Sequence, residues 1–161
     1  MEFDPKNACC FTGHRPERLG APEESVIKWL DEQIHKAYND GYRVFISGMQ
    51  RGVDIWAAEI VLKMKKEGLP VQIVAACAFK GMENKWEEDW IKRYKNILSE
   101  ADDIVYVAGF PGRNAFFARN EWMVDNSGRL IAVFTGAPGG TKMTIAYAKR
   151  NHCEIVNMGS N

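Results

Sequence analysis

The sequence carries no excess of either positive or negative charge. Lysine and arginine together number 21, aspartate and glutamate also number 21, and the formal net charge is therefore 0. A dedicated nucleic-acid-binding protein usually has a positive excess, which attracts the phosphate backbone. The charge balance argues against a nucleic-acid partner and leaves only a local basic patch open.

Cysteine and histidine are few, and their spacing is not that of a metal site. The four cysteines form no CxxC pair: Cys9, Cys10, Cys77 and Cys153. The three histidines show no ligand spacing with these thiols: His14, His35 and His152. We therefore expect no bound metal, and nothing in the sequence indicates a cofactor. Reduced packing cysteines are the simpler interpretation, with Cys9, Cys10 and Cys77 buried in strands and unpaired.

Long hydrophobic runs are also absent. No apolar run reaches the roughly 18 residues that a membrane span needs, and residues 1–6 lack the character of a signal peptide. We expect a cytoplasmic protein that makes no membrane contact. The 161 residues, 46% of them hydrophobic, suit one globular domain. No linker, repeat or low-complexity segment divides the chain, so we expect a single domain over residues 1–161.

Short apolar runs that alternate with helical periods are what the sequence does contain. The runs predict strands at 8–13, 42–47, 71–77, 103–108, 129–135 and 154–158. The helical periods between them predict helices at about 22–41, 53–67, 85–99, 115–124 and 141–150. Parallel strands need long crossovers, which the helices supply. The pattern predicts an α/β, Rossmann-like, doubly wound domain with a mostly parallel sheet of about six strands and helices on both faces.

Three loops that follow predicted strands are rich in glycine: "TGHRP" (12–16), "SGMQRGVD" (47–54) and "TGAPGGT" (135–141). In such folds the ligand lies at the carboxyl ends of the strands, so we expect these loops at one edge of the sheet. Glycines permit close backbone approach, helix N-termini attract anions, and arginines bind phosphate. The loops supply most of our candidate ligand-binding residues: Thr12, Gly13, His14, Arg15, Ser47, Gly48, Arg51, Gly52, Asp54, Thr135, Gly136, Gly139, Gly140 and Thr141.

Each of these features also has a purely structural interpretation. A glycine-bearing loop is an ordinary connection between a strand and a helix, and Asp54 would serve as a helix N-cap without any ligand. His14 would then be a surface histidine, and Trp56 would pack in or near the core. The aromatic stripe of Trp86, Trp90 and Tyr94 has the spacing of a buried helical face.

Three segments carry a resemblance to a known family: "CFTGHRP", "SGMQRGVDIWAAE" and "RNEWMVDNSGRLIAVFTGAPGGT". They resemble the YpsA-like family of the SLOG superfamily of Rossmann-like nucleotide-binding domains. The likeness extends over nearly the whole chain, with the motifs in the family's order. It implies a small-molecule partner, namely a nucleotide or a nucleotide derivative such as ADP-ribose.

The second segment is also similar to a loop of the DNA-processing protein A (Smf) family. That loop has the form SG-x-A-x-G-[IV]-D and matches residues 47–54, with Gln50 in place of the usual alanine. This similarity implies single-stranded DNA binding as one alternative function.

The third segment is similar to the phosphate site of LOG-type phosphoribohydrolases. Arg119 and Met123 match their R-K-x-x-M segment, with Asn120 in place of lysine. Residues 138–141 match their P-G-G-x-G-T-x-x-E segment approximately, but the loop is shorter and no glutamate follows in the first turns of the helix. The resemblance implies a ligand-binding role for Arg119, which joins the candidates above.

Cleavage of a glycosidic bond needs a carboxylate near the anomeric carbon, and the catalytic glutamate of the LOG type is missing. Asp54, Glu59 or Glu121 could replace it, but the sequence places none of them there. We therefore rank nucleotide or nucleotide-sugar binding first, phosphoribosyl hydrolysis second and DNA binding third. The sequence leaves open whether a reaction is catalysed, and it leaves open the oligomeric state, a homo-oligomer included.

Overall fold

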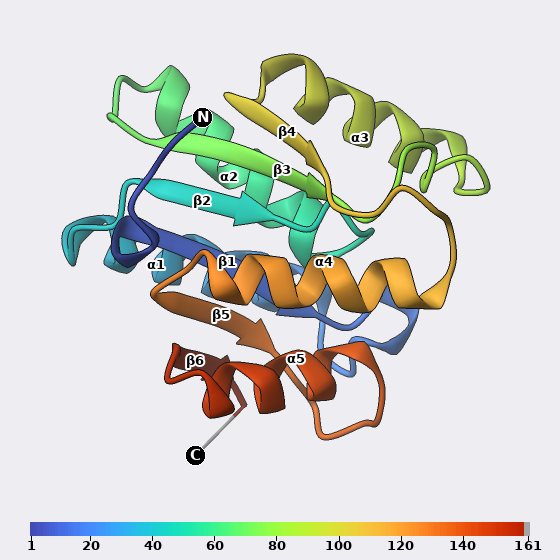
Figure 1. Ribbon diagram of the computed structural model, residues 1–161. Helices are drawn as coiled ribbons and strands as arrows, with labels where there is room; N and C mark the ends of the chain where they lie inside the picture. The colour runs from blue at the N-terminus through green and yellow to red at the C-terminus, as the bar shows by residue number, and fades with distance from the viewer. Residues whose placement is uncertain (160–161) are drawn as a thin grey trace.

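The computed structural model describes residues 1–159 and is built around one six-stranded sheet (Figure 1). The strands are β1 (Ala8–Gly13), β2 (Val44–Ser47), β3 (Gln72–Cys77), β4 (Asp103–Tyr106), β5 (Arg129–Val133) and β6 (Glu154–Met158). The helices are α1 (Glu23–Asn39), α2 (Val53–Lys66), α3 (Glu88–Glu100), α4 (Arg113–Asp125) and α5 (Gly140–Arg150), with short 3-10 turns at Pro5–Asn7 and Pro16–Arg18.

All five strand pairings in the sheet are parallel, and the strand order is β4-β3-β2-β1-β5-β6. This arrangement confirms the predicted Rossmann-like α/β fold. The order reverses at β1, which pairs with β2 on one side and with β5 on the other. The loops after β1, β2 and β5 consequently leave the same edge of the sheet, and β1 and β5 form the switch point where such folds open a crevice.

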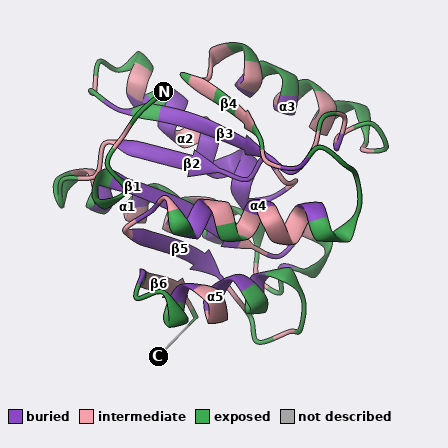
Figure 2. Ribbon diagram, viewed as in Figure 1, coloured by how far each residue is buried: buried purple, intermediate pink, exposed green. Residues whose placement is uncertain are grey.

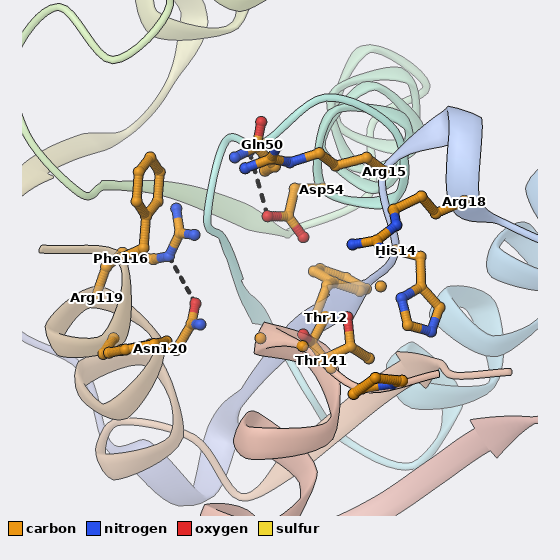
Figure 3. A pocket seen from close by; sticks show the side chains of 16 residues that line it. Thr12, His14, Arg15, Arg18, Gln50, Asp54, Phe116, Arg119, Asn120 and Thr141 are labelled. Atoms are coloured by element: carbon orange, nitrogen blue, oxygen red, sulfur yellow. Dashed lines mark hydrogen bonds between the residues drawn. The ribbon is translucent and has the colours of Figure 1, made fainter. Parts of the chain in front are cut away.

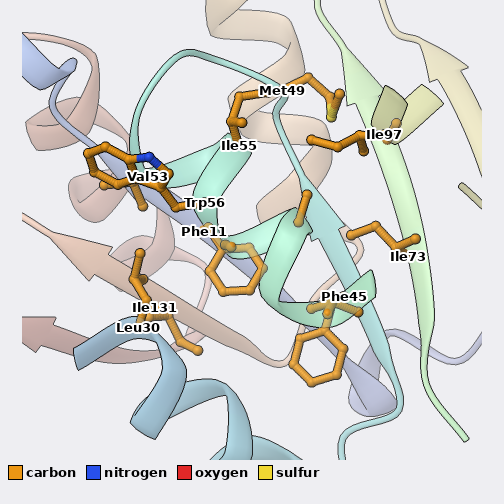
Figure 4. Packing of buried hydrophobic residues seen from close by; sticks show 14 of the residues in the cluster. Phe11, Leu30, Phe45, Met49, Val53, Ile55, Trp56, Ile73, Ile97 and Ile131 are labelled. Carbon is orange, nitrogen blue, oxygen red and sulfur yellow. The ribbon is translucent and has the colours of Figure 1, made fainter. Parts of the chain in front are cut away.

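Helices cover the two faces of the sheet unequally (Figure 1). Helices α1, α2 and α3 pack on one face around the larger apolar cluster, which includes Phe11, Phe45, Trp56 and Ile73 (Figure 4). Helices α4 and α5 pack on the other face around a smaller cluster. The N-terminal segment crosses that second face near β2 and β3, where no helix lies in front of the strands (Figure 1). The central strands are buried on both faces (Figure 2).

Helix α1 shows how the sequence pattern produces this packing. Its apolar residues recur every three or four positions, which places them on one stripe. Val26, Leu30, Ile34 and Ala37 are fully buried against the sheet, as the periodicity predicts. The prediction for the cysteines is confirmed as well, because Cys9, Cys10 and Cys77 are buried in strands and carry free thiols.

Two predictions on the β3–α3–β4 segment are wrong in detail. Helix α3 begins at Glu88 rather than near residue 85, because Glu87 has an extended backbone, so Trp86 lies in a turn before the helix. Trp86 still contacts Tyr94, edge to face. Strand β4 ends at Tyr106 rather than at residue 108, and it lies at one edge of the sheet, where Ile104 and Tyr106 are 38% and 43% exposed.

Candidate functional site

A cavity of about 240 Å³ lies at the switch point, and sixteen residues line it (Figure 3). They come from the end of β1 and its loop, from the loop after β2 with the first turn of α2, from α4, and from the start of α5. This is the place where the fold predicts a ligand, and the elements that form it are distant in sequence.

The loop after β1 supplies a close helix contact and a buried histidine. A Cβ on Gly13 would lie 2.3 Å from Cγ2 of Val53, so glycine is required for α2 to begin beside β1. His14 is 7% exposed, and its Nε2 accepts the backbone N–H of Thr135 at 3.3 Å. Burial and then the charge of Arg18 lower the pKa of His14. The ring is therefore neutral at pH 7, and its hydrogen bond to Thr135 assigns the remaining proton to Nδ1.

The loop after β2 is held by hydrogen bonds and close packing. The Ser47 hydroxyl donates to the main-chain oxygen of Asp54 at 2.8 Å and accepts the N–H of Met49 at 3.1 Å. A Cβ on Gly48 would lie 2.8 Å from Oδ2 of Asp54 and 3.1 Å from Cζ of Arg119. Only glycine fits between these two charged side chains, so the glycine of this loop serves packing.

Asp54 is the carboxylate that this loop and the first turn of α2 bring into the cavity (Figure 3). Its side chain does not cap the helix as predicted, because the N-cap position belongs to Gly52. Instead Oδ2 accepts the backbone N–H of Gln50 at 3.2 Å. Burial raises the pKa of Asp54 to about 6, against the opposing effects of the Arg119 charge and the Gln50 hydrogen bond.

Arg119 of α4 is buried beside this carboxylate, with 4% exposure. Its Nη1 donates to the carbonyl oxygen of Gly48, and its Nε donates to Oδ1 of Asn120 at 2.8 Å. Cζ lies 5.4 Å from the centre of the Phe116 ring. Burial lowers the pKa of Arg119, but a guanidinium stays protonated at any physiological pH. A fixed positive charge therefore forms one wall of the cavity.

The start of α5 forms the opposite wall with an open backbone. Gly139 precedes the helix at φ 139°, and nothing lies within 4 Å of a Cβ built on it. A Cβ on Gly140 would meet only Nδ2 of Asn120, at 3.8 Å. The first N–H groups of a helix have no partner inside the helix. Together with the helix dipole, they make this wall suitable for an anion.

The structure brings most of the candidate residues to this cavity. The candidates that line it are Thr12, Gly13, His14, Arg15, Asp54, Arg119, Gly139, Gly140 and Thr141. The candidates that do not line it are Ser47, Gly48, Arg51, Gly52, Thr135 and Gly136. Arg51 is turned to a surface ion pair with Glu17 at 2.9 Å, and Gly52 packs against Pro16. Thr135 and Gly136 line a separate groove beside β6.

Sequence reasoning missed seven residues of the lining: Phe11, Arg18, Gln50, Phe116, Phe117, Asn120 and Pro138. Arg18 lies just beyond the first glycine loop, and Gln50 lies inside the second, so proximity to the motifs could have found both. Phe116 and Phe117 carried no signal, since adjacent aromatic residues in a helix usually indicate packing.

The charges around the cavity favour an anion. The lining residues include three arginines, Arg15, Arg18 and Arg119, and one carboxylate, Asp54. Among residues 1–159, no group of three or more His, Cys, Asp or Glu side chains could hold a metal ion. Within the same range, no helix combines the length and hydropathy needed to cross a bilayer.

The sheet topology and the cavity at its switch point define a Rossmann-like domain with a ligand-sized site at the carboxyl edge of its strands. A family model described as the YspA SLOG family (YpsA) matches residues 9–157, and the chain belongs to this family. A UPF0398 protein of Bacillus cereus strain B4264 is 30% identical over 158 residues, which cover 92% of this chain and 85% of that protein.

Two solved structures share the fold. DNA processing protein A (DprA) from Streptococcus pneumoniae matches with a TM-score of 0.65 at 15% identity, over 98% of this chain and 51% of that one. The chain thus spans about half the length of that protein. DNA processing protein A from Helicobacter pylori, solved in a study of its single-stranded DNA binding, matches with a TM-score of 0.66 at 16% identity, over 98% and 67% of the two chains.

Proposed function

We propose that this protein binds a nucleotide or a nucleotide sugar of the ADP-ribose type, with its phosphate in the cavity at the switch point. The observation that carries this proposal is the pairing of three arginines with the open N-terminus of α5 across one cavity. Backbone N–H groups and arginine forks are the groups that proteins use for phosphate. Membership of the SLOG family supports the same class of ligand.

The lining also contains features that suit the rest of a nucleotide. Phe117 and Asn120 are shared with an adjoining groove of about 150 Å³ between α4 and α5, which Met143 and Tyr147 also line. A phosphate at α5 would place a base or a second sugar within reach of this more apolar groove. Binding without transformation accounts for the site best, because α5 contains no glutamate that could take the place of the catalytic one.

Calorimetric titration with ADP-ribose and AMP tests the proposal. Arg15 is exposed, so its replacement by alanine should leave the fold intact and remove one phosphate contact. A charge-assisted hydrogen bond is worth about 1.5–3 kcal/mol, and Arg15→Ala should weaken binding about tenfold to hundredfold. Arg51→Ala, which removes an equal charge outside the cavity, is the matched control and should bind as the wild type does. Failure of the wild type to bind either nucleotide would refute the proposal.

Hydrolysis of a phosphoribosyl bond is a second candidate, and the position of Asp54 favours it. Among the three carboxylates considered as replacements for the missing glutamate, Asp54 lines the cavity, while Glu59 pairs with Arg93 and Glu121 lies in the adjoining groove. Chromatographic detection of free base released from nucleoside monophosphates tests this candidate, with Asp54→Asn as the inactive variant.

Single-stranded DNA binding is a third candidate, favoured by the structural similarity to DNA processing protein A of Helicobacter pylori. The zero net charge of the chain argues against it. Titration of a labelled oligonucleotide at two salt concentrations tests it, because phosphate-dominated binding weakens steeply as salt rises.

A further inference from the structure

The carboxylate of Asp54 has one oxygen that the protein itself leaves without a hydrogen-bond partner. The residue is 6% exposed, and its Oδ2 accepts the N–H of Gln50. Within residues 1–159, its Oδ1 is buried and has no partner. A buried carboxylate oxygen without a donor is unfavourable, because it has lost its water and gained nothing in exchange. Figure 3 shows this side chain between the arginines of the cavity.

The hydrogen bonds of Ser47 and Arg119 go to acceptors other than this oxygen. The hydroxyl of Ser47 donates to the main-chain oxygen of Asp54 and not to its side chain. Arg119 donates to the carbonyl of Gly48 and to Asn120, and no ion pair within 4.0 Å joins it to Asp54. The packing around Gly48 holds both charged groups in place. Asp54 lines the cavity, but Oδ1 itself exposes less than 1 Å² of its surface, so a ligand donor reaches it only when a neighbouring side chain of the lining shifts.

The chemistry of this oxygen restricts the ligand. The pKa of about 6 leaves Asp54 ionised at pH 7.5, so Oδ1 accepts hydrogen bonds and repels phosphate oxygens. A ligand that places phosphate against the arginines must therefore present a donor to Asp54. The volume of about 240 Å³ is below the roughly 300–1,000 Å³ of pockets for drug-sized ligands, so it suits a sugar phosphate portion. The donors next to a nucleotide's phosphate are its ribose hydroxyls.

We propose that Oδ1 of Asp54 accepts a hydrogen bond from a ribose hydroxyl, so that the site selects ribonucleotides over nucleotides that lack ring hydroxyls. This inference rests on the proposed nucleotide function and adds the sugar to it. It also separates the site from one built for a DNA strand, which has no 2′-hydroxyl and whose 3′-oxygens are esterified, so that neither can donate to Asp54.

AMP and 2′,3′-dideoxy-AMP are the matched probes, since they share phosphate and base and differ only in the ring hydroxyls. Calorimetry of the wild type should show AMP binding about tenfold to hundredfold tighter, the range of one hydrogen bond to a charged group. In Asp54→Asn the N–H of Gln50 still needs an acceptor, so the amide oxygen faces Gln50 and the amide nitrogen faces the cavity. The charged acceptor becomes a neutral donor, with which a ribose hydroxyl can form only a weaker hydrogen bond, so the preference for AMP should fall to a few-fold or less.

Two controls make the result decisive. Affinity for 2′,3′-dideoxy-AMP should be unchanged or higher in Asp54→Asn, which shows that the variant is folded. Glu59→Gln removes a carboxylate from the same helix, at a position paired with Arg93 outside the cavity, and should keep the preference. Equal binding of the two probes by the wild type, or an unchanged preference in Asp54→Asn, would overturn this inference and leave the proposed function standing. If neither AMP nor ADP-ribose binds the wild type, the proposed function fails and the inference with it.

Discussion

The loops after β2 and β5 look alike in sequence and use their glycines for different purposes. After β2, an added Cβ on Gly48 would collide with two charged side chains, and one on Gly52 would lie 3.0 Å from Cδ of Pro16. After β5, a Cβ on Gly136 or Gly139 would meet nothing within 4 Å. The β2 loop is thus a packed support, and the β5 loop is an open surface. A glycine-rich loop after a strand is therefore no evidence by itself that the loop touches a ligand.

Gly48→Val should show the largest effect, because it tests the packed loop directly. Its branched side chain would push apart Asp54 and Arg119 and would disturb the hydrogen bond from Arg119 to the Gly48 carbonyl. Overpacking and the loss of a charged hydrogen bond together predict a fall of about 3–5 kcal/mol in the free energy of unfolding. Urea denaturation measures it, and wild-type stability in this variant would mean that the β2 loop is as open as the β5 loop.

Asp54→Asn should stabilise the free protein at neutral pH by about 3 kcal/mol. The pKa of Asp54 is about 6 in the folded protein against an ordinary 3.8, and this difference corresponds to that energy. The folded state binds the Asp54 proton more tightly than the unfolded state does. The free energy of unfolding of the wild type therefore falls as the pH rises from about 4 to 6 and is constant above that. The free energy of unfolding of Asp54→Asn should not fall in this range, because asparagine does not titrate. Urea denaturation of both proteins across this range should give free energies of unfolding that agree near pH 4 and differ increasingly above it. A difference between the two proteins that does not change with pH would contradict the prediction.

Gly140→Val tests the open loop and should act on binding rather than on stability. The added side chain meets only Nδ2 of Asn120, so the free energy of unfolding should change by less than about 1 kcal/mol. The side chain would occupy the space through which a phosphate approaches the start of α5, and affinity for ADP-ribose should fall at least about tenfold. Calorimetry and denaturation of one preparation measure both. Loss of stability without loss of affinity would reverse the assignment of the two loops.

Arg51→Ala should have the smallest effect, although Arg51 stands in the most recognisable motif of the sequence. Its ion pair with Glu17 is at the surface, where such pairs contribute about 0–1 kcal/mol. We expect denaturation midpoints close to those of the wild type. A large loss of stability would mean that the β2 loop depends on this ion pair as well as on its glycines.

Arg119 shows where an expectation from sequence needs refinement. The resemblance to the LOG type selected it, and the structure brings it to the cavity. Arg119 is 4% exposed, and it donates a hydrogen bond to the Gly48 carbonyl. Replacing it would therefore disturb packing together with any ligand contact. Arg15 and Arg18 are the exposed charges of the cavity, and they allow cleaner tests.

The sequence by itself determined the fold. Buried strands such as "ACCFTG" and amphipathic helices such as α1 can be recognised from the local spacing of apolar residues. A chain in which such strands and helices alternate has few possible topologies besides a parallel sheet with helical crossovers. It also determined the edge of the sheet where ligands would lie, because parallel strands end together. The sequence prediction was wrong locally at the start of α3, where Glu87 has an extended backbone, and at the end of β4, which has a neighbouring strand on one side only.

Only the tertiary structure decided which loop residues face the cavity and what each glycine does. Arg51 and Asp54 lie three positions apart in one motif, yet Arg51 turns to Glu17 and Asp54 turns inward. That difference depends on residues outside the motif. Arg51 pairs with Glu17, and a Cβ added to Gly52 or to Gly48 would lie 3.0 Å from Pro16 or 3.1 Å from Arg119. Contacts between segments distant along the chain leave no local periodicity. They arise when the packed sheet brings the ends of β1, β2 and β5 together, and this is why the free oxygen of Asp54 is visible only in the folded protein.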